Sequence, residues 1–323
     1  MKAALVTRYG PPEVVTVGEA PKPVPGPGEL LVRVHAATVN RTDCGELRPH
    51  PQLGRLVFGL IRPRRRIFGM DFAGTVEAVG EGVTAFTPGD RVFGMCPARR
   101  NGAQADYVCL PKTAPIAALP EGVPFAGGVV CEGAYYANSS LKRYLTEPGR
   151  DVLVYGASGA IGSAAVQLAR HYGANVTAAV ETRHLAMAGS LGADRVVTTA
   201  ELGRLGPSFD LVLDAVGKMS RRQWRPLLKP DGAFATTDIG PWGQNLLWIL
   251  WARLRGDKNV SVPLPERGGA LAFVGLLARL LEAGRYRAIV DRTYKLDDIA
   301  EAYRYVESGR KAGIVVIDVA GDG

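Results

Sequence analysis

The feature that most constrains the fold is a glycine-rich turn between an apolar segment and a segment of helical periodicity, DVLVYGASGAIGSAAVQLARHYG at Asp151–Gly173. Residues 151–155 are mostly apolar, and two are β-branched, which is typical of a buried strand. Gly156, Gly159 and Gly162 then punctuate a turn, after which apolar residues recur at helical intervals. Strand, turn and helix in this order predict one βα unit of a parallel sheet.

The same alternation of strands and helices continues after this turn. Further strand-like runs lie at 175–180, 195–197, 209–214, 233–237 and 259–262. Helices are expected at 160–172 and 184–191. The alternation predicts a doubly wound parallel sheet.

Residues 1 to about 120 contain short β-branched runs bounded by Gly and Pro, which predict a β-rich region. The tail has the pattern of a helix, a strand, a second helix and a last strand. One domain is therefore expected to be inserted into another. The expected fold class is α/β, with a β-rich domain beside a doubly wound parallel-sheet domain.

Composition excludes several classes of protein. The chain has 323 residues, of which 47% are hydrophobic and 22% charged, which predicts a soluble globular protein with room for two domains. The net charge of +8 is spread along the chain apart from RPRRR at Arg62–Arg66, so no nucleic-acid partner is expected. The four cysteines form no CxxC pair, which argues against a ribbon-type zinc site and a disulfide framework.

No targeting or membrane-spanning segment is expected. The N-terminal apolar run is too short for a signal peptide. The most hydrophobic segment, NLLWILWARL at Asn245–Leu254, has about half of the roughly 20 residues that a spanning helix needs. The expected location is the cytoplasm.

The glycine turn is expected to bind a pyrophosphate. In a parallel sheet, ligands bind beyond the carboxyl ends of the strands, and a helix that begins there presents backbone N–H groups and the positive end of its dipole. The GxxGxxG spacing is weaker than the GxGxxG fingerprint, but its strand–turn–helix context supports a dinucleotide site. The loop residues expected to bind the cofactor are Gly156, Ser158, Gly159, Ala160, Ile161 and Gly162.

The next strand ends in AVETRHL, where the adenosine ribose of a dinucleotide would lie. An acidic residue there accepts hydrogen bonds from the ribose hydroxyls of NADH, whereas arginine binds the 2′-phosphate of NADPH. Glu181 and Arg183 are both present and favour opposite cofactors. We favour NADPH because the guanidinium group of arginine can donate two hydrogen bonds to a phosphate, with NADH as the alternative.

Several segments in order resemble the medium-chain dehydrogenase/reductase superfamily, specifically its zinc-free quinone-oxidoreductase-like branch. GMDFAGTVEAVGEGVTAFTPGDRVFG at Gly69–Gly94 is similar to the GroES-like domain signature, and FDLVLDAVG, LKPDGAFATTD and YVESGRKAGIVVI are similar to later segments. The resemblance implies a GroES-like catalytic domain at 1–124 and 265–323 and a Rossmann cofactor-binding domain at 125–264. It also implies a homodimer that pairs through an edge strand near Asn259–Val262.

The resemblance has a chemically important gap. Zinc-dependent relatives take metal ligands from CxTD and GHE segments, where this chain has NRTD and GMD, so that Asn40, Met70 and Asp71 replace cysteine, histidine and glutamate. Amide and thioether groups are poor zinc ligands, so no metal is expected. Without a Lewis acid, the substrate must delocalise its own developing charge, as quinones and α,β-unsaturated carbonyls do.

Other site residues are implied by the resemblance. Asn40 is expected near the nicotinamide as a substrate-orienting or carbonyl-polarising group, although a turn-holding role is the alternative. EGAYYA replaces the usual GLTA, which makes Tyr135 or Tyr136 the candidate proton donor, with aromatic packing as the alternative. The remaining residues expected to contact the cofactor are Thr182, Val216, Gly217, Thr237, Asp238 and Lys311.

The sequence thus predicts an NADPH-dependent, zinc-independent reductase of quinones or enones. Two apolar segments, Leu53–Gly69 and WGQNLLWILWARL, suit a small hydrophobic electrophile, and the first is a candidate lid. Two alternatives stay open: an enoyl reductase that acts on acyl chains, and a nucleotide-binding sensor or scaffold with little turnover.

Overall fold

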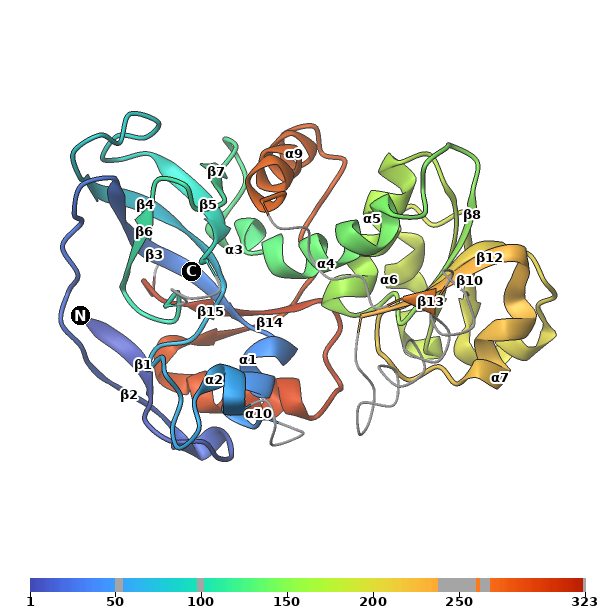
Figure 1. Ribbon diagram of the computed structural model, residues 1–323, viewed down its shortest axis with the longest axis horizontal. Helices are drawn as coiled ribbons and strands as arrows, with labels where there is room; N and C mark the ends of the chain where they lie inside the picture. The colour runs from blue at the N-terminus through green and yellow to red at the C-terminus, as the bar shows by residue number, and fades with distance from the viewer. Residues whose placement is uncertain (50–54, 98–101, 238–259, 262–267, 322–323) are drawn as a thin grey trace. The chain divides into compact units, whose positions relative to one another are not determined.

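The computed structural model describes residues 1–49, 55–97, 102–237, 260–261 and 268–321 (Figure 1). The chain folds into two compact units. The first unit is Met1–Glu132 together with Gly268–Gly323, and the second is Gly133–Arg267. Both ends of the chain therefore belong to the first unit, and the second is an insertion between them.

The first unit is built on a seven-stranded sheet of order β14-β15-β3-β4-β5-β7, in which β6 pairs with β3, and on a separate β1-β2 pair. Its strands are β1 (Lys2–Val6), β2 (Val15–Glu19), β3 (Glu29–Val39), β4 (Asp71–Val79), β5 (Arg91–Met95), β6 (Tyr107–Pro111), β7 (Ile116–Ala118), β14 (Val290–Lys295) and β15 (Ile314–Asp318). The described helices are η1 (Pro12–Val14), α1 (Arg41–Leu47), α2 (Arg55–Phe58), α3 (Phe125–Gly128), α9 (Ala270–Glu282), η7 (Leu296–Asp298) and α10 (Ile299–Glu307).

The two ends of the chain join within this sheet. β15 from the C-terminal segment runs antiparallel to β3, with Val316 opposite Thr38. Alternate residues of β3 enter a core shared with α10, in which Val32, Val34 and Tyr303 are almost fully buried. This core supports the loop between β3 and α1, where Asn40 lies.

The second unit has a six-stranded parallel sheet of order β10-β9-β8-β11-β12-β13. Its strands are β8 (Asp151–Tyr155), β9 (Asn175–Val180), β10 (Arg195–Thr198), β11 (Phe209–Asp214), β12 (Leu228–Thr236) and β13 (Val260–Ser261). Its described helices are α5 (Ala160–His171), η3 (Thr182–His184), α6 (Leu185–Gly189), η4 (Thr199–Arg204), α7 (Arg221–Trp224) and η5 (Arg225–Leu227), and α4 (Cys131–Lys142) leads into it. The chain proceeds outward from β8 on one side and from β11 on the other, so the strand order reverses between them.

The predicted fold class is confirmed by this arrangement. The predicted strands at 151–155, 175–180 and 209–214 have the observed bounds of β8, β9 and β11. β12 begins earlier than predicted, at Leu228, because LKPDG continues into the strand despite its turn-like composition. The division between the two compact units falls between Glu132 and Gly133, and the domain limits named above remain a proposal.

The helix α3 belongs to the first unit. A Cβ on Gly128 would lie 3.1 Å from the Cβ atoms of Ala73 in β4 and Phe93 in β5, so the helix packs closely on the sheet of the first unit. Glycine permits this approach because it has no side chain.

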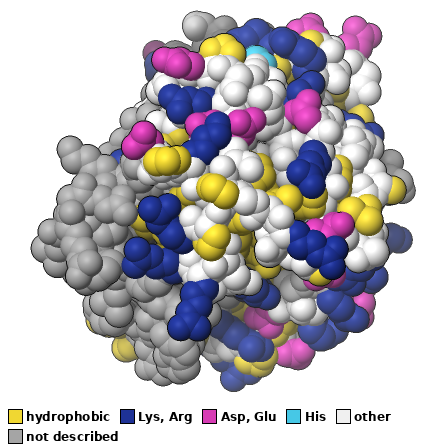
Figure 2. Space-filling view, turned by 90° about the vertical axis from the view of Figure 1, so that its right-hand side faces the viewer, with side chains coloured by type: hydrophobic (Ala, Val, Ile, Leu, Met, Phe, Trp, Pro, Cys, Tyr) yellow, Lys and Arg dark blue, Asp and Glu magenta, His cyan; other side chains and the backbone are white. Residues whose placement is uncertain are grey.

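Charged side chains are mixed on the face that Figure 2 displays, where Lys and Arg lie among Asp and Glu. Among the described residues, no helix combines the length and apolar character that crossing a membrane would require.

Candidate functional site

The glycine turn joins β8 to α5, and Gly159 is the N-cap of that helix. Gly156 has φ of +75°, and a Cβ at Gly162 would lie 2.1 Å from the Gly156 carbonyl oxygen, so the turn closes only with glycine at both positions. At Gly159 the nearest described atom to a Cβ is the Gly156 oxygen, at 3.7 Å. The outer side of the turn is therefore open, beside N–H groups of α5 that have no intrahelical acceptor. These features fit a phosphate group.

The loops that follow neighbouring strands meet at this edge of the sheet. The Gly156 N–H donates to the Ala179 carbonyl at 3.0 Å, and the Thr237 N–H donates to the Asp214 carbonyl at 3.1 Å. A Cβ at Gly156 would lie 2.1 Å from Cγ2 of Val216, a side chain that is partly exposed beside the turn. The structure thus brings together the predicted residues of the glycine turn with Val216, Gly217 and Thr237, whereas Asp238 lies outside the described residues.

Asp214 holds the loop after β11 and was not predicted. Its Oδ1 accepts hydrogen bonds from the N–H groups of Val216 at 3.0 Å and Gly217 at 2.9 Å, and its Oδ2 accepts one from Met219 at 2.7 Å. Burial raises the pKa of this carboxyl, although the backbone donors lower it in part. The sequence signal that could have identified Asp214 is an aspartate at the end of an apolar strand, three residues before a glycine.

At the tip of β9, Glu181 and Arg183 form an ion pair with Oε2 and Nη2 2.8 Å apart. Both side chains are more than half exposed, so water screens the pair and its contribution to stability is small. Thr182 lies between them at the start of η3. Without a bound cofactor, Arg183 is therefore paired with the carboxylate of Glu181.

In the first unit, Asn40 caps α1 and is enclosed by hydrogen bonds. Its Nδ2 donates to Oε2 of Glu132 at 2.6 Å and to Oγ1 of Thr38 at 3.0 Å. Its backbone N–H donates to Oδ2 of Asp43 at 2.7 Å, within a capping box. Because an amide nitrogen carries two hydrogens, both are already donated within the protein.

Three buried carboxyl groups surround this cap. The Glu132 backbone N–H donates to Oδ1 of Asp71 at 2.8 Å, and the Gly69 N–H donates to Oδ1 of Asp43 at 3.1 Å. Burial, followed by the charge of Glu132, raises the pKa of both Asp43 and Asp71 well above the usual range. Burial also raises the pKa of Glu132, while hydrogen bonds from Thr42 and Asn40 lower it. Glu132 was not predicted, although a charge in the apolar run GGVVCEGAYYA was a usable signal.

Lys311 is a cation near this cluster. Its Nζ donates to the Gly313 carbonyl at 2.7 Å. Burial lowers the pKa of Lys311 to about 8, and the charge of Glu132 opposes that shift. The structure therefore places Lys311 with Asn40 and Glu132 in the first unit, whereas the other predicted cofactor contacts belong to the second unit.

The two predicted proton donors lie near the start of α4. Tyr135 is buried and Tyr136 is half-buried, and their backbone carbonyls accept hydrogen bonds from Ser139 at 2.9 Å and Ser140 at 3.0 Å. In the candidate lid, Phe68 is buried, whereas Leu60 and Ile61 are exposed, and residues 53–54 lie outside the described part of the chain. The second apolar segment also lies outside the described residues.

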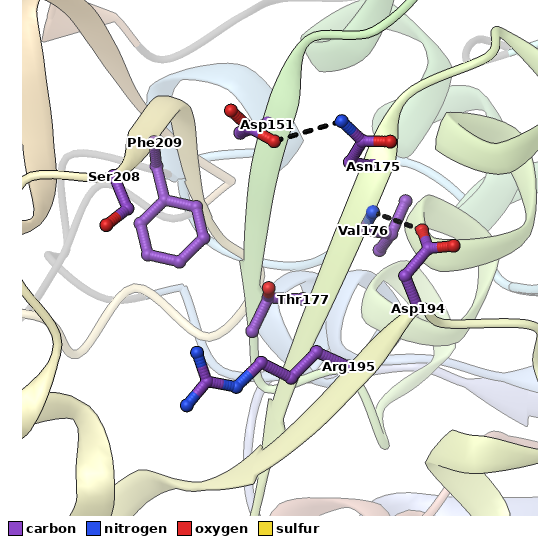
Figure 3. A pocket seen from close by; sticks show the side chains of 8 residues that line it. All are labelled: Asp151, Asn175, Val176, Thr177, Asp194, Arg195, Ser208 and Phe209. Atoms are coloured by element: carbon purple, nitrogen blue, oxygen red, sulfur yellow. Dashed lines mark hydrogen bonds between the residues drawn. The ribbon is translucent and has the colours of Figure 1, made fainter.

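A small pocket lies at the opposite edge of the parallel sheet, where strands begin (Figure 3). It is lined by Asp151, Asn175, Val176, Thr177, Asp194, Arg195, Ser208 and Phe209. None of the predicted site residues belongs to it, and parallel sheets bind their ligands at the other edge. The pocket therefore does not enter the candidate site.

Comparison with known proteins identifies the family. Residues 26–136 match the family model described as an alcohol dehydrogenase GroES-like domain, and residues 191–317 match the model described as a zinc-binding dehydrogenase. The chain belongs to the medium-chain dehydrogenase/reductase superfamily. Its first unit is accordingly GroES-like and its second is Rossmann-like, and the superfamily assigns it to the oxidoreductases.

Individual relatives of this dehydrogenase/reductase agree with the quinone-oxidoreductase-like branch. A chloroplastic quinone-oxidoreductase of Triphysaria versicolor is 28% identical over 93% of this chain and 92% of its own. A trans-enoyl reductase of Aspergillus terreus is 29% identical over 91% of this chain and 87% of its own. The structure of the quinone oxidoreductase from Coxiella burnetii has a TM-score of 0.84 with 24% identity, covering 99% of both chains, and shows the shared fold.

The zinc positions of the superfamily can be tested against this geometry. Nδ2 of Asn40 donates its hydrogens to Glu132 and Thr38, and an amide nitrogen is a poor metal ligand because its lone pair is delocalised into the carbonyl group. Asp71 accepts a backbone N–H, and Met70 has only a thioether. Within the described residues, no group of three or more His, Cys, Asp or Glu side chains is arranged to hold a metal ion. The residues at the superfamily's zinc positions do not fit zinc.

Proposed function

We propose that this chain is an NADPH-dependent, zinc-independent reductase of quinones or α,β-unsaturated carbonyl compounds. The observation that carries the proposal is the state of Asn40, whose amide hydrogens are both donated to Glu132 and Thr38 at a position where zinc-dependent relatives have a metal ligand. Neither a Lewis acid nor this amide would then polarise a substrate carbonyl. The substrate must spread its developing negative charge through its own conjugation.

The residues of the second unit support nicotinamide dinucleotide binding. The open side of the turn at Gly159 would hold the pyrophosphate against the start of α5, and Arg183 would bind the 2′-phosphate of NADPH. Val216, Gly217 and Thr237 would line the path toward the nicotinamide, with Lys311 of the first unit as a further contact. The bound cofactor would supply a hydride.

Proton delivery completes the proposed reaction. A quinone or enone that accepts a hydride also needs a proton, and a phenol of Tyr135 or Tyr136 is the proposed donor. Asn40 then acts as a positioning residue, because it caps α1 and its amide donates a hydrogen bond to Glu132 in the first turn of α4. The homodimer through β13 and the cytoplasmic location remain predictions.

A second candidate is the reduction of enoyl groups on acyl chains. The trans-enoyl reductase among the relatives favours it, and the chemistry is the same because an enoyl thioester is also a conjugated electrophile. The two candidates differ in the length of the substrate.

The test uses the purified full chain. NADPH and NADH are first titrated separately by nicotinamide fluorescence, and NADPH oxidation is then followed with a naphthoquinone, a cyclic enone, a trans-2-enoyl thioester and a saturated ketone. We expect tighter binding of NADPH and turnover of the quinone or the enone, but not of the ketone. Faster turnover of the thioester would favour the second candidate, and binding of neither cofactor would refute the oxidoreductase proposal.

Metal removal is a separate prediction. Dialysis against EDTA and 1,10-phenanthroline is expected to leave the quinone turnover unchanged, because the residues at the zinc positions do not fit the metal. Metal analysis of the purified chain provides the control. Stoichiometric zinc together with loss of activity on chelation would contradict the prediction.

A further inference from the structure

A turn on the surface of the first unit exposes two adjacent aliphatic side chains. Leu60 is 67% exposed and Ile61 is 90% exposed. The other large exposed hydrophobic side chains of the described residues are isolated in the sequence: Val24, Val216, Leu271 and Val290. Single exposed aliphatic residues are common on protein surfaces, but an adjacent pair at the tip of a turn is a candidate contact.

The turn is anchored at several points. The Arg64 N–H donates to the Phe58 carbonyl at 2.9 Å and closes it, and the Tyr9 hydroxyl donates to the Gly59 carbonyl at 2.7 Å. Gly59 has φ of +127°, a conformation that side chains strongly disfavour. The pair is therefore held outward by a defined turn.

A further anchor lies just after the tip. Nη2 of Arg65 lies 2.6 Å from Oε1 of Glu46, and both side chains are largely buried. The Arg66 carbonyl accepts a hydrogen bond from the Val6 N–H at 2.7 Å. The side chain of Arg65 is thus directed inward, whereas Arg64 and Arg66 on either side of it are exposed.

The exposed charged residues of the turn itself are all positive. Arg62, Arg64 and Arg66 are exposed, and Leu53–Gly69 contains no Asp or Glu. The acidic Glu46, a largely buried side chain, is paired with Arg65. An exposed apolar pair followed by exposed arginines is complementary to a surface with negative headgroups above an apolar layer.

We propose that the Gly59–Arg66 turn docks on anionic phospholipid membranes, with Leu60 and Ile61 entering the headgroup region and the arginines binding phosphates. Two exposed aliphatic side chains are too small for a stable protein–protein interface, which buries roughly 1,200 Å² or more. Nucleic acids are less suited because the tip has no aromatic side chain for stacking on bases. The proposal is independent of the substrate proposed above.

The experiment is flotation of the full chain with vesicles of phosphatidylcholine alone and of phosphatidylcholine with 30% phosphatidylglycerol, at low and high salt. Two double variants are compared with the parent chain, Leu60→Ser/Ile61→Ser and Arg62→Gln/Arg64→Gln. Matched controls change exposed residues elsewhere, Val24→Ser/Leu271→Ser and Arg222→Gln/Arg225→Gln. Thermal unfolding checks that each variant folds.

We expect binding to the anionic vesicles, weakened by salt, and little binding to phosphatidylcholine. Loss of two arginines near the surface should lower the partition coefficient roughly 30-fold, at about fivefold for each charge. The Leu60/Ile61 variant should lose at least fivefold, and the controls should stay within about twofold. Equal binding to both vesicle types, no binding, an equal loss in the controls, or tighter binding to an oligonucleotide than to the vesicles would overturn the proposal.

Discussion

At the tip of β9, the ion pair of Glu181 and Arg183 sets up a competition for one guanidinium group. The carboxylate lies 2.8 Å from the arginine, in the region where a dinucleotide would place its adenosine ribose. A 2′-phosphate would have to share or displace that partner. Cofactor preference therefore depends on the balance between two neighbouring residues.

This competition predicts opposite effects for two substitutions. Arg183→Ala should weaken NADPH binding by roughly 10-fold or more and change NADH binding little, because it removes a charge-assisted contact to phosphate. Glu181→Gln should tighten NADPH binding and weaken NADH binding. Fluorescence titration of both cofactors measures the two effects, with the exposed Arg222→Ala as control. An equal loss of both cofactors in Arg183→Ala would show that the arginine does not read the phosphate.

At the scale of the element, the turn between β8 and α5 assigns different roles to its glycines. Gly162 is needed for the backbone to close, since its Cβ would lie 2.1 Å from an oxygen, whereas Gly159 has open space. Gly159 also has φ of −79°, which alanine adopts without strain. A substitution at Gly162 should therefore affect folding, whereas one at Gly159 should affect cofactor binding alone.

Alanine at each position provides the test. Gly162→Ala should lower the melting temperature strongly, because the backbone must shift to relieve the clash. Gly159→Ala should leave the melting temperature nearly unchanged but weaken dinucleotide binding about 10-fold or more, because its methyl group would fill the space left for the phosphate. If Gly159→Ala binds NADPH as the parent chain does, the pyrophosphate does not lie there.

At the scale of the whole molecule, the buried carboxyls of the first unit couple stability to pH. The folded-state pKa values of Asp43, Asp71 and Glu132 lie above the ordinary values of 3.8 and 4.5. At pH values between the ordinary and the folded-state pKa of each group, the folded chain therefore binds more protons than the unfolded chain. The free energy of unfolding therefore falls as pH rises through the folded-state pKa values. Lys311 acts in the opposite direction between about 8 and its ordinary value of 10.5, where the unfolded chain binds the extra proton.

Asp71→Asn tests this coupling. The substitution keeps an oxygen that can accept the Glu132 N–H and removes a buried charge close to Glu132. We expect little change in stability at pH 3, where Asp71 is protonated in both the folded and the unfolded chain, and a gain of about 1 kcal/mol or more at pH 8. The variant should therefore lose less stability than the parent chain between the two pH values. Urea unfolding at both pH values measures it, with the exposed Glu81→Gln as control. An equal change at both pH values would contradict the linkage.

Much of the parallel-sheet unit could be predicted because its signals are local. β8, β9 and β11 are continuous apolar runs, and the turn after β8 needs glycine for backbone reasons that any similar turn would share. The roles of Asp214 and Glu132 could not be predicted in this way. Each depends on hydrogen bonds to a backbone group or an amide, and in Glu132 the partner Asn40 lies far away in the sequence.

By itself, the sequence determined the fold class, the alternation of strands and helices along the chain after the glycine turn, and the family. These features follow from hydrophobic periodicity, turn chemistry and the order of the family-like segments. All of these signals lie in residues that are close together in the sequence. Only the tertiary structure decided that Asn40 has no amide hydrogen left to donate, that Arg183 already has a carboxylate partner, and that Leu60 and Ile61 face solvent. The physical reason is that hydrogen-bond saturation, charge pairing and burial depend on which atoms fold to within a few ångströms of each other.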